Sequence, residues 1–259
     1  MALPFYQIDA FADAPFQGNP AAVMILEAWL PDATLQTIAQ ENNLAETAFV
    51  IPREGPWALR WFTPEGEIDL CGHATLASAH VAFHELGFIG EVLAFDTQSG
   101  LLHVRREDPW LVMDFPARPG QLCEAPLGLF EALGVSPRPV TLARDHMVVL
   151  DSEEDVRALT PDFRALDRVA TEGVMVTAPG EEVDFVSRFF TPRATIPEDP
   201  VTGSAHCVLV PYWAERLGKT HLTARQLSPR GGFLRCVLQG DRVEMAGRAV
   251  KVLEGAFLV

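Results

Sequence analysis

The sequence predicts an α+β fold of two similar lobes related by pseudo-two-fold symmetry, each a largely antiparallel sheet wrapped round a central helix. Three observations indicate this fold: an internal repeat, short β-rich runs between turn residues, and two apolar helical segments that each end at a glycine. The chain has 259 residues, of which 48% are apolar, and this is enough to fill two hydrophobic cores.

The internal repeat relates two motif regions. "RWFTPEGEI" begins at residue 60 and "RFFTPRATI" at residue 188, and they share Arg, Phe, Thr, Pro and Ile at an offset of 188 − 60 = 128. Further along, "GHA" from Gly72 matches "GSA" from Gly203, at an offset of 203 − 72 = 131. Upstream of each motif the pattern predicts strand, helix, strand. Two copies indicate duplication of one unit rather than a solenoid, which needs three or more.

The remaining elements follow from local patterns. Residues 93–108, 109–115, 233–247 and 249–259 are β-rich runs between turn residues, which predicts hairpins. Residues 73–86 are apolar nearly all round and stop at Gly87, which predicts a buried helix with a glycine C-cap. Residues 204–217 predict a second such helix that stops at Gly218, although Pro211 is expected to kink it or divide it in two.

The two repeated motifs are expected at the N-terminal ends of the two central helices, facing one cleft. Free backbone N–H groups and the positive helix end favour a carboxylate or a developing oxyanion there. Small residues at both motifs, among them Gly72, Thr75, Gly203 and Ser204, allow a ligand to approach the backbone.

Composition excludes several classes of partner. The net charge of −15, without a basic stretch, argues against nucleic acid and anionic membranes. No apolar run approaches the roughly 18 residues of a membrane span, and the N-terminus lacks the pattern of a signal peptide. The four cysteines form no CxxC pair, which predicts a reduced cytoplasmic setting and no structural zinc site.

"NNLAETAFV", "CGHATLASAH" and "EDPVTGSAH", in that order, resemble the PhzF family, named for the phenazine-biosynthesis isomerase. The resemblance covers effectively the whole chain and implies the fold of diaminopimelate epimerase. It implies a first lobe of 1–116 and 248–259, a second lobe of 117–247, and an active site in the cleft between them. It also implies acid–base isomerisation of a small carboxylic-acid substrate, with no metal or organic cofactor, in a protein expected to be a homodimer.

The same resemblance implies four catalytic residues: Glu46, His73, Asp199 and Ser204. Glu46 would take a proton from one carbon and return it to another on the same face, which is an allylic or double-bond isomerisation. The positive helix end is expected to depress the pKa of His73, leaving a neutral imidazole as hydrogen-bond donor. Glu172 is interpreted as the match of Glu46 in the second lobe. The predicted substrate-binding residues are Gly72, Ala74, Thr75, Gly203, Ala205, Ser99 and Gly100.

Two other functions remain open: a cysteine-type racemase or epimerase of an amino acid, and a non-catalytic protein that binds a small acid. The racemase scheme uses two cysteines, one per lobe, whereas Cys71 has no match before Cys207, so Cys71 is interpreted as a packed residue. His80 and His84 have i, i+4 spacing, but no carboxylate at ligand spacing joins them, and a metal site is not predicted. Arg60 and Arg188, which precede the two "FTP" triplets, are interpreted as structural.

Overall fold

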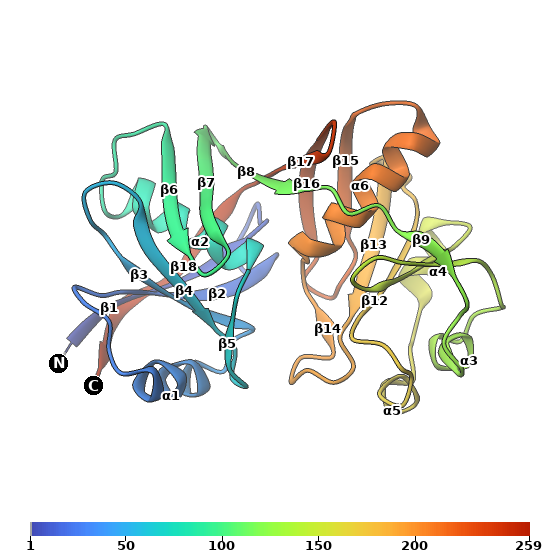
Figure 1. The fold of residues 1–259 in the computed structure, drawn as a ribbon, viewed down its shortest axis with the longest axis horizontal. Helices are drawn as coiled ribbons and strands as arrows, with labels where there is room; N and C mark the ends of the chain where they lie inside the picture. Colours follow the sequence, from blue (N-terminus) through green and yellow to red (C-terminus); the bar gives the residue numbers. More distant parts are fainter. Residues whose placement is uncertain (1) are drawn as a thin grey trace. The chain divides into compact units, whose positions relative to one another are not determined.

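The structure is a computed structural model that describes residues 2–259, and Figure 1 shows its elements along the chain. The chain divides into two compact units. Unit 1 is Met1–Asp114 together with Ala246–Val259, and unit 2 is Phe115–Met245.

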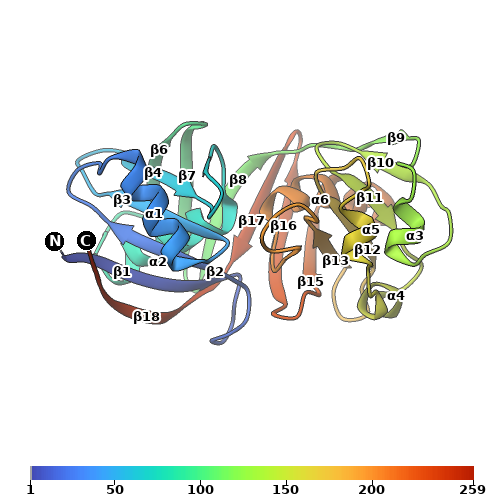
Figure 2. The same ribbon diagram turned by 90° about the horizontal axis from the view of Figure 1, so that it is seen from below.

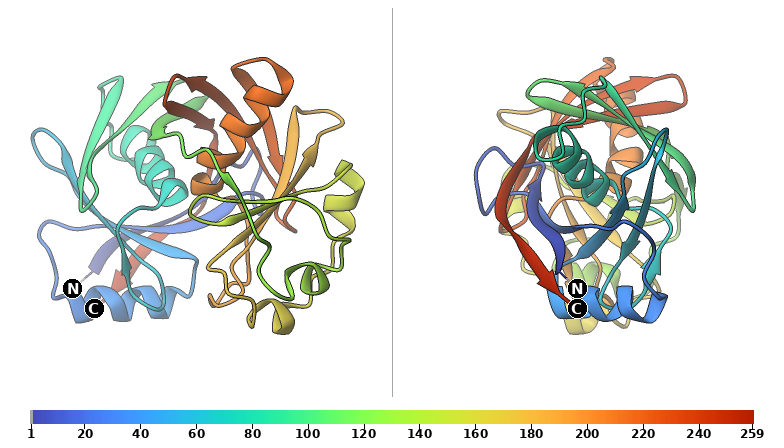
Figure 3. Two further views of the ribbon diagram at one scale, coloured as in Figure 1. Left: turned by 45° about the vertical axis from the view of Figure 1, so that its right-hand side comes forward. Right: turned by 90° about the vertical axis from the view of Figure 1, so that its left-hand side faces the viewer.

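Unit 1 is a mostly antiparallel sheet around one buried helix. Two of its strand pairs, β2–β3 and β4–β6, are parallel. The chain's last strand, β18, pairs antiparallel with β1, so the first and last strands lie side by side (Figure 2). Strands of the unit surround α2 (Figure 3), and ten of its 13 residues are buried. The elements are β1 (Ala2–Ala10), β2 (Asn19–Ile25), α1 (Asp32–Asn42), β3 (Glu46–Ile51), β4 (Trp57–Phe62), β5 (Glu67–Ile68), α2 (Gly72–His84), β6 (Val92–Thr97), β7 (Gly100–Glu107), β8 (Trp110–Pro116) and β18 (Ala249–Leu258).

Unit 2 repeats this plan around α6. Its two parallel pairs, β11–β12 and β13–β15, stand at the same places in the order of elements as those of unit 1. Nine of the 15 residues of α6 are buried. The elements are β9 (Gln121–Cys123), α3 (Leu129–Leu133), β10 (Val140–Leu142), β11 (His146–Val149), α4 (Glu153–Ala158), α5 (Phe163–Leu166), β12 (Val174–Pro179), β13 (Phe185–Phe190), β14 (Glu198–Asp199), α6 (Gly203–Leu217), β15 (His221–Gln226), β16 (Gly232–Gln239) and β17 (Arg242–Gly247). The predicted α+β fold of two similar units is confirmed.

The two arginines of the repeat make the same structural interaction in each unit. Arg60 on β4 binds Glu67 on β5 through two hydrogen bonds of 2.6 and 2.7 Å. Arg188 on β13 binds Glu198 on β14 in the same way, at 2.7 and 2.8 Å. The bidentate pair ties each short strand to its neighbour immediately before the central helix.

The units differ on the other face of the sheet. In unit 1 a single helix, α1, packs Leu35 and Ile38 against the sheet. In unit 2 two short helices, α4 and α5, take this place. Pro161 explains the division, because the residue before a proline is disfavoured in helical conformation and a proline cannot donate the next hydrogen bond.

The helix α6 ends as the sequence predicted, with Gly218 as its C-cap in a left-handed conformation, φ 66°. The helix α2 ends earlier than predicted, at His84, with Glu85 as its C-cap, and the left-handed Gly87, φ 69°, follows two residues later. Pro211 does not divide α6, which was one of the two expected effects. Proline removes the helical donor to the carbonyl of Cys207, and the backbone N–H of Arg118 takes its place at 2.8 Å. Within residues 2–259, no helix is long and apolar enough to cross a membrane.

Candidate active site

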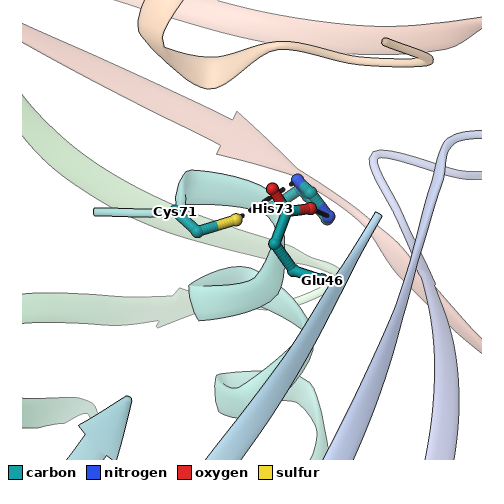
Figure 4. A group of neighbouring side chains, drawn as sticks. All are labelled: Glu46, Cys71 and His73. Atoms are coloured by element: carbon teal, nitrogen blue, oxygen red, sulfur yellow. Dashed lines mark hydrogen bonds and ion pairs between the residues drawn. The ribbon is translucent and has the colours of Figure 1, made fainter. Parts of the chain in front are cut away.

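The N-terminal end of α2 carries a cluster of reactive side chains. Glu46 begins β3 on the face of the sheet that α2 covers, and His73 is the second residue of α2. The Nε2 of His73 lies 3.0 Å from the Oε2 of Glu46 (Figure 4), and the side chains are only 5% and 16% exposed. The N–H is not well aligned with the oxygen, and neither atom has another hydrogen-bond partner within residues 2–259. The pair therefore has bonding capacity left for a third group.

The other ring nitrogen of His73 is surrounded by protein. Its Nδ1 lies 3.2 Å from the Nδ2 of Asn19, at the start of β2, and 3.5 Å from the Sγ of Cys71. Asn19 can offer its amide N–H to a neutral ring or, turned about its last bond, its oxygen to a charged one. These contacts fix the ring so that Nε2 faces Glu46.

The protonation of His73 differs from the sequence-based expectation. Burial alone lowers the pKa of His73, but the neighbouring Cys71 and Glu46 outweigh burial, and the net shift is well upward. Burial also raises the pKa of the Cys71 thiol, as does Glu46. The two acidic neighbours, Cys71 and Glu46, together favour the imidazolium form of His73. The predicted depression of the His73 pKa is wrong, because a carboxylate 3.0 Å away acts more strongly than the helix end.

Glu46, Cys71 and His73 are the one group among residues 2–259 whose side chains are of the types that bind metal ions and lie close enough together to share one. Ligand atoms of Glu46, Cys71 and His73 lie within 4.8 Å of one another. The sulfur approaches Nδ1 of the imidazole, however, whereas the carboxylate approaches Nε2. One ion binds one ring nitrogen, so this arrangement suits proton transfer between the groups better than metal binding.

In unit 2 the N-terminal end of α6 is held by a polar network. Thr202, the residue before the helix, donates its hydroxyl hydrogen to the Oδ2 of Asp199 at 2.5 Å. Gln226 donates to the Oγ1 of Thr202 at 3.1 Å and accepts from its backbone N–H at 2.8 Å. This network orients the predicted catalytic Asp199. Ser204, the second residue of α6, makes no side-chain hydrogen bond within residues 2–259, which leaves its hydroxyl available.

The other predicted residues lie on or beside the two helix ends. Ser99 donates its hydroxyl hydrogen to the carbonyl of Asp69, and Ser228 in unit 2 makes the corresponding bond to Pro200, both at 2.8 Å. Ser99 therefore shapes the segment before α2. The hydroxyl of Thr75 is used within the helix, at 2.6 Å from the carbonyl of Cys71. Gly72, Ala74, Gly203 and Ala205 lie in the first turns of α2 and α6, and Gly100 begins β7.

Neither central helix has a side-chain cap at its N-terminal end. Cys71 and Thr202 occupy the cap positions, and neither side chain accepts a hydrogen bond from the first turn. In contrast, Ser152 caps α4 and Asp162 caps α5. The first N–H groups of α2 and α6 have no acceptor within the helix, so they can bind an anion.

Residues 8–255 match the family described as Phenazine biosynthesis-like protein, PhzC-PhzF. The chain belongs to this phenazine biosynthesis-like family. A Pseudomonas aeruginosa protein named as an uncharacterized isomerase is 54% identical over 255 residues, 98% of each chain. A PhzF-family protein structure from Enterococcus faecalis is 49% identical, with a TM-score of 0.97 over 100% of both chains. A hydroxyproline epimerase from Agrobacterium vitis is 12% identical, with a TM-score of 0.62 over 98% of this chain and 92% of that one, and shows a similar fold only.

The register of this PhzF-family chain corrects one match made from the sequence. Thr47 pairs with Phe62 in unit 1, and Val174 pairs with Phe190 in unit 2. Because Phe62 and Phe190 are related by the repeat, Thr47 corresponds to Val174, and Glu46 corresponds to the residue before it, Gly173. Glu172, proposed from the sequence as the match, has a side chain that is 83% exposed.

Sequence reasoning missed Asn19, Thr202 and Gln226 as residues that organise the helix ends. Asn19 stands immediately before an apolar strand and is fully buried, which is unusual for an amide. Thr202 occupies the same place before its helix as Cys71, and that position could have been found from the repeat. Gln226 gave no local signal, since its partners are 24 and 27 residues away.

Two histidines of the central helices, His206 and His80, predict loss of stability at acid pH. Burial lowers the pKa of His206 from 6.5 to about 4, although its bond to the carbonyl of Thr202 opposes the shift. Burial, and then His84, lowers the pKa of His80 to about 4 as well. Between pH 6.5 and about 4, these histidines are protonated in the unfolded chain but stay neutral in the folded chain. Part of the unfolding free energy present at neutral pH is therefore lost as the pH falls from 6.5 toward 4.

Urea unfolding of His206→Gln checks this expectation. Between pH 7 and pH 4.5, the wild type should lose about 2–3 kcal/mol more unfolding free energy than the variant. His103→Gln, at an exposed position of β7, is the control and should keep the wild-type pH dependence. Equal pH dependence of all three proteins would show that His206 is not held neutral.

Proposed function

We propose that the protein is an isomerase that shifts a proton within a small carboxylic acid, with Glu46 as the base. The family match and the relatives named as isomerases support an isomerase-type function. The observation that carries the finer proposal is the buried Glu46–His73 pair beside the uncapped end of α2. It combines a carboxylate able to take a proton with N–H groups able to hold the substrate's own carboxylate.

In the proposed reaction, Glu46 removes a proton from a carbon of the substrate, and the electron pair of the C–H bond moves toward the carboxyl group. The N–H groups at the start of α2 and the imidazolium of His73 stabilise the charge that develops. Glu46 then returns the proton to another carbon, which shifts the double bond. We propose that Asp199 and Ser204 contact the same substrate, as the resemblance to the family implies. The step needs no oxidant or reductant.

Deuterium incorporation tests the proposal. The protein is incubated in D₂O with vinylacetate and with its α-amino and α-hydroxy derivatives, and the products are followed by mass spectrometry and NMR. We expect a displaced double bond, with solvent deuterium at the new C–H position in part of the product. Binding in a thermal-shift assay without exchange in any of these acids would favour the alternative of a non-catalytic binding protein.

One observation favours the cysteine-type racemase as a second candidate: the Sγ of Cys71 lies 3.5 Å from the Nδ1 of His73. A racemase of this type needs a second thiol, yet the corresponding position in unit 2 is Thr202. Burial also raises the pKa of Cys71 and so disfavours the reactive thiolate.

Cys71→Ala is therefore expected to retain at least about a third of wild-type exchange activity and to lose at most about 1–2 kcal/mol of unfolding free energy, at the mild end of large-to-small core changes. Exchange rates and urea unfolding measure the two quantities. Cys123→Ala, at a half-buried cysteine of β9, is the matched control. Abolished exchange in a folded Cys71→Ala protein would revive the racemase.

A further inference from the structure

Unit 2 contains a cavity of about 350 Å³ whose lining includes none of the residues of the candidate active site. It is lined by the end of α3 and the segment that follows, by the two residues after β11, and by α4 with the residues after it. All of these segments belong to unit 2, so the cavity is formed within one unit. Its volume stands at the lower end of the roughly 300–1,000 Å³ of small-molecule sites, which suits a ligand of the size of an amino acid.

The apolar part of this lining is fixed by the core of the unit. Leu133, Leu150 and Leu159 line the cavity, and they are only 1%, 3% and 8% exposed. All three belong to one cluster of buried residues that forms the core beneath α3, α4 and α5. Side chains packed in a core keep their positions. The three leucines therefore offer a preformed apolar surface to the side chain of a ligand.

Arg138 supplies a positive group that is held in place and still has donors to offer. Its side chain is 21% exposed. Its Nε donates to the carbonyl of Ser136 and its Nη1 to the carbonyl of Val149, both at 3.2 Å. Its Nη2 makes no hydrogen bond to any of residues 2–259. A guanidinium fixed in this way, with two N–H groups unused, is a binding group for a carboxylate.

Two carboxylates line the same cavity beside this arginine. The Oδ2 of Asp151 lies 3.5 Å from the Nη1 of Arg138. The Oδ2 of Asp155 accepts the hydroxyl hydrogen of Ser152 at 2.6 Å, and its Oδ1 accepts no hydrogen bond within residues 2–259. Two negative groups and one positive group line the cavity, so a ligand that carries an ammonium group is attracted to it, whereas a simple anion is repelled by the aspartates.

We propose that this cavity binds an apolar α-amino acid as its zwitterion. The carboxylate of the ligand accepts from Arg138, its ammonium group donates to Asp151 and Asp155, and its side chain packs against the three leucines. An α-amino acid bears both charged groups on one carbon atom, which fits an arginine and an aspartate that lie 3.5 Å apart. An amine without a carboxylate would leave the Nη2 of Arg138 without an acceptor. The inference goes beyond the proposed isomerisation, because no residue of that reaction lines the cavity.

Isothermal titration calorimetry of the full chain with L-leucine tests the inference. For a ligand of this size we expect a dissociation constant on the order of 0.1–1 mM. Two analogues separate the charged groups: 4-methylpentanoate lacks the amino group, and 3-methylbutylamine lacks the carboxylate. Each should bind at least about tenfold more weakly than leucine, because each loses hydrogen bonds to a charged partner.

Two variants place the binding in the cavity. Arg138→Met should weaken leucine binding roughly 10–100-fold, and Arg168→Met, at an exposed arginine of unit 2 outside the cavity, is its matched control. Ala158→Phe, at an exposed position of the lining, should block the cavity while every polar group stays in place. This second variant keeps the test open if Arg138→Met fails to fold, which circular dichroism shows.

Methyl NMR of leucine-labelled protein locates the ligand directly. Unlabelled L-leucine should shift the methyl signals of Leu133, Leu150 and Leu159, assigned with single leucine-to-valine variants. Shifts confined to leucines of unit 1 would place the ligand at the candidate active site and overturn the inference.

Three calorimetric results would also overturn it: no binding of leucine, wild-type affinity in Ala158→Phe, or 4-methylpentanoate binding as tightly as leucine. None of these results bears on the proposed function, since deuterium exchange in the wild type and in Glu46→Gln decides that question separately. Conversely, an enzyme inactive with every acid tested would leave the expected binding of leucine unchanged.

Discussion

Replacing Glu46 by glutamine is expected to lower the rate of proton exchange by roughly 10²–10⁴-fold, the usual contribution of a general base. The amide has nearly the same shape and can still contact His73, but it cannot accept a proton from carbon. Folding and substrate binding should therefore change little. Deuterium exchange, near-ultraviolet circular dichroism and thermal-shift binding measure the three quantities.

Histidine NMR provides an independent check on Glu46→Gln. Since the Glu46 carboxylate raises the pKa of His73, removal of its charge should lower the pKa of His73. Glu41→Gln, at an exposed position near the end of α1, is the matched control and should leave both exchange and the His73 pKa unchanged. Exchange activity of Glu46→Gln within threefold of wild type would exclude Glu46 as the base.

Replacing Arg188 by methionine is expected to cost about 3–5 kcal/mol of unfolding free energy, because it leaves a buried carboxylate without its partner. The side chains of Arg188 and Glu198 are only 10% and 12% exposed. Arg188 also donates to the carbonyl of Leu159 at 2.7 Å, just beyond α4. Loss of the guanidinium therefore leaves both a charge and a backbone acceptor without a donor. Urea unfolding measures the change.

The repeat supplies the control for this variant. Arg60 forms the same bidentate pair with Glu67, but those side chains are 18% and 22% exposed. Water can therefore replace more of the hydrogen bonds that are lost when Arg60 is removed. Arg60→Met should therefore cost clearly less than Arg188→Met. In addition, Glu198→Met made in the Arg188→Met background should recover part of the loss, since it removes the unpaired charge. A loss below about 1 kcal/mol in Arg188→Met would show that the pair is not a structural anchor.

The two units use the same supports for different chemistry. Both units contain the bidentate arginine–glutamate pair. Both also contain a serine hydroxyl that donates a hydrogen bond to the segment before the central helix. At the helix ends, however, Cys71 and His73 correspond to Thr202 and Ser204. Duplication thus explains why both helix ends are built alike, and divergence explains why a glutamate–histidine pair stands at the start of α2, whereas threonine and serine stand at the start of α6.

The sequence by itself determined the plan of each unit. The offset of 128 between the two "FTP" motifs predicted the duplication, and apolar segments ending at Gly87 and Gly218 predicted the central helices. The helices and their ends depend on neighbours within a few residues along the chain, where steric limits and hydrogen-bond spacing act directly. The continuity of α6 through Pro211 could not be predicted in this way, because the backbone N–H that donates to the carbonyl of Cys207 belongs to Arg118, far away along the chain.

Only the tertiary structure decided the electrostatics and the contacts of the site. Asn19 reaches His73 across 54 residues, and Glu46 reaches it from a different strand, so the helix alone predicted the wrong direction for the pKa of His73. The match of Glu46 to Gly173 rather than Glu172 depended on strand register, since a shift of one residue turns a side chain to the other face of the sheet. Burial and charge act through space, and the distances that set them exist only after strands distant in sequence have paired.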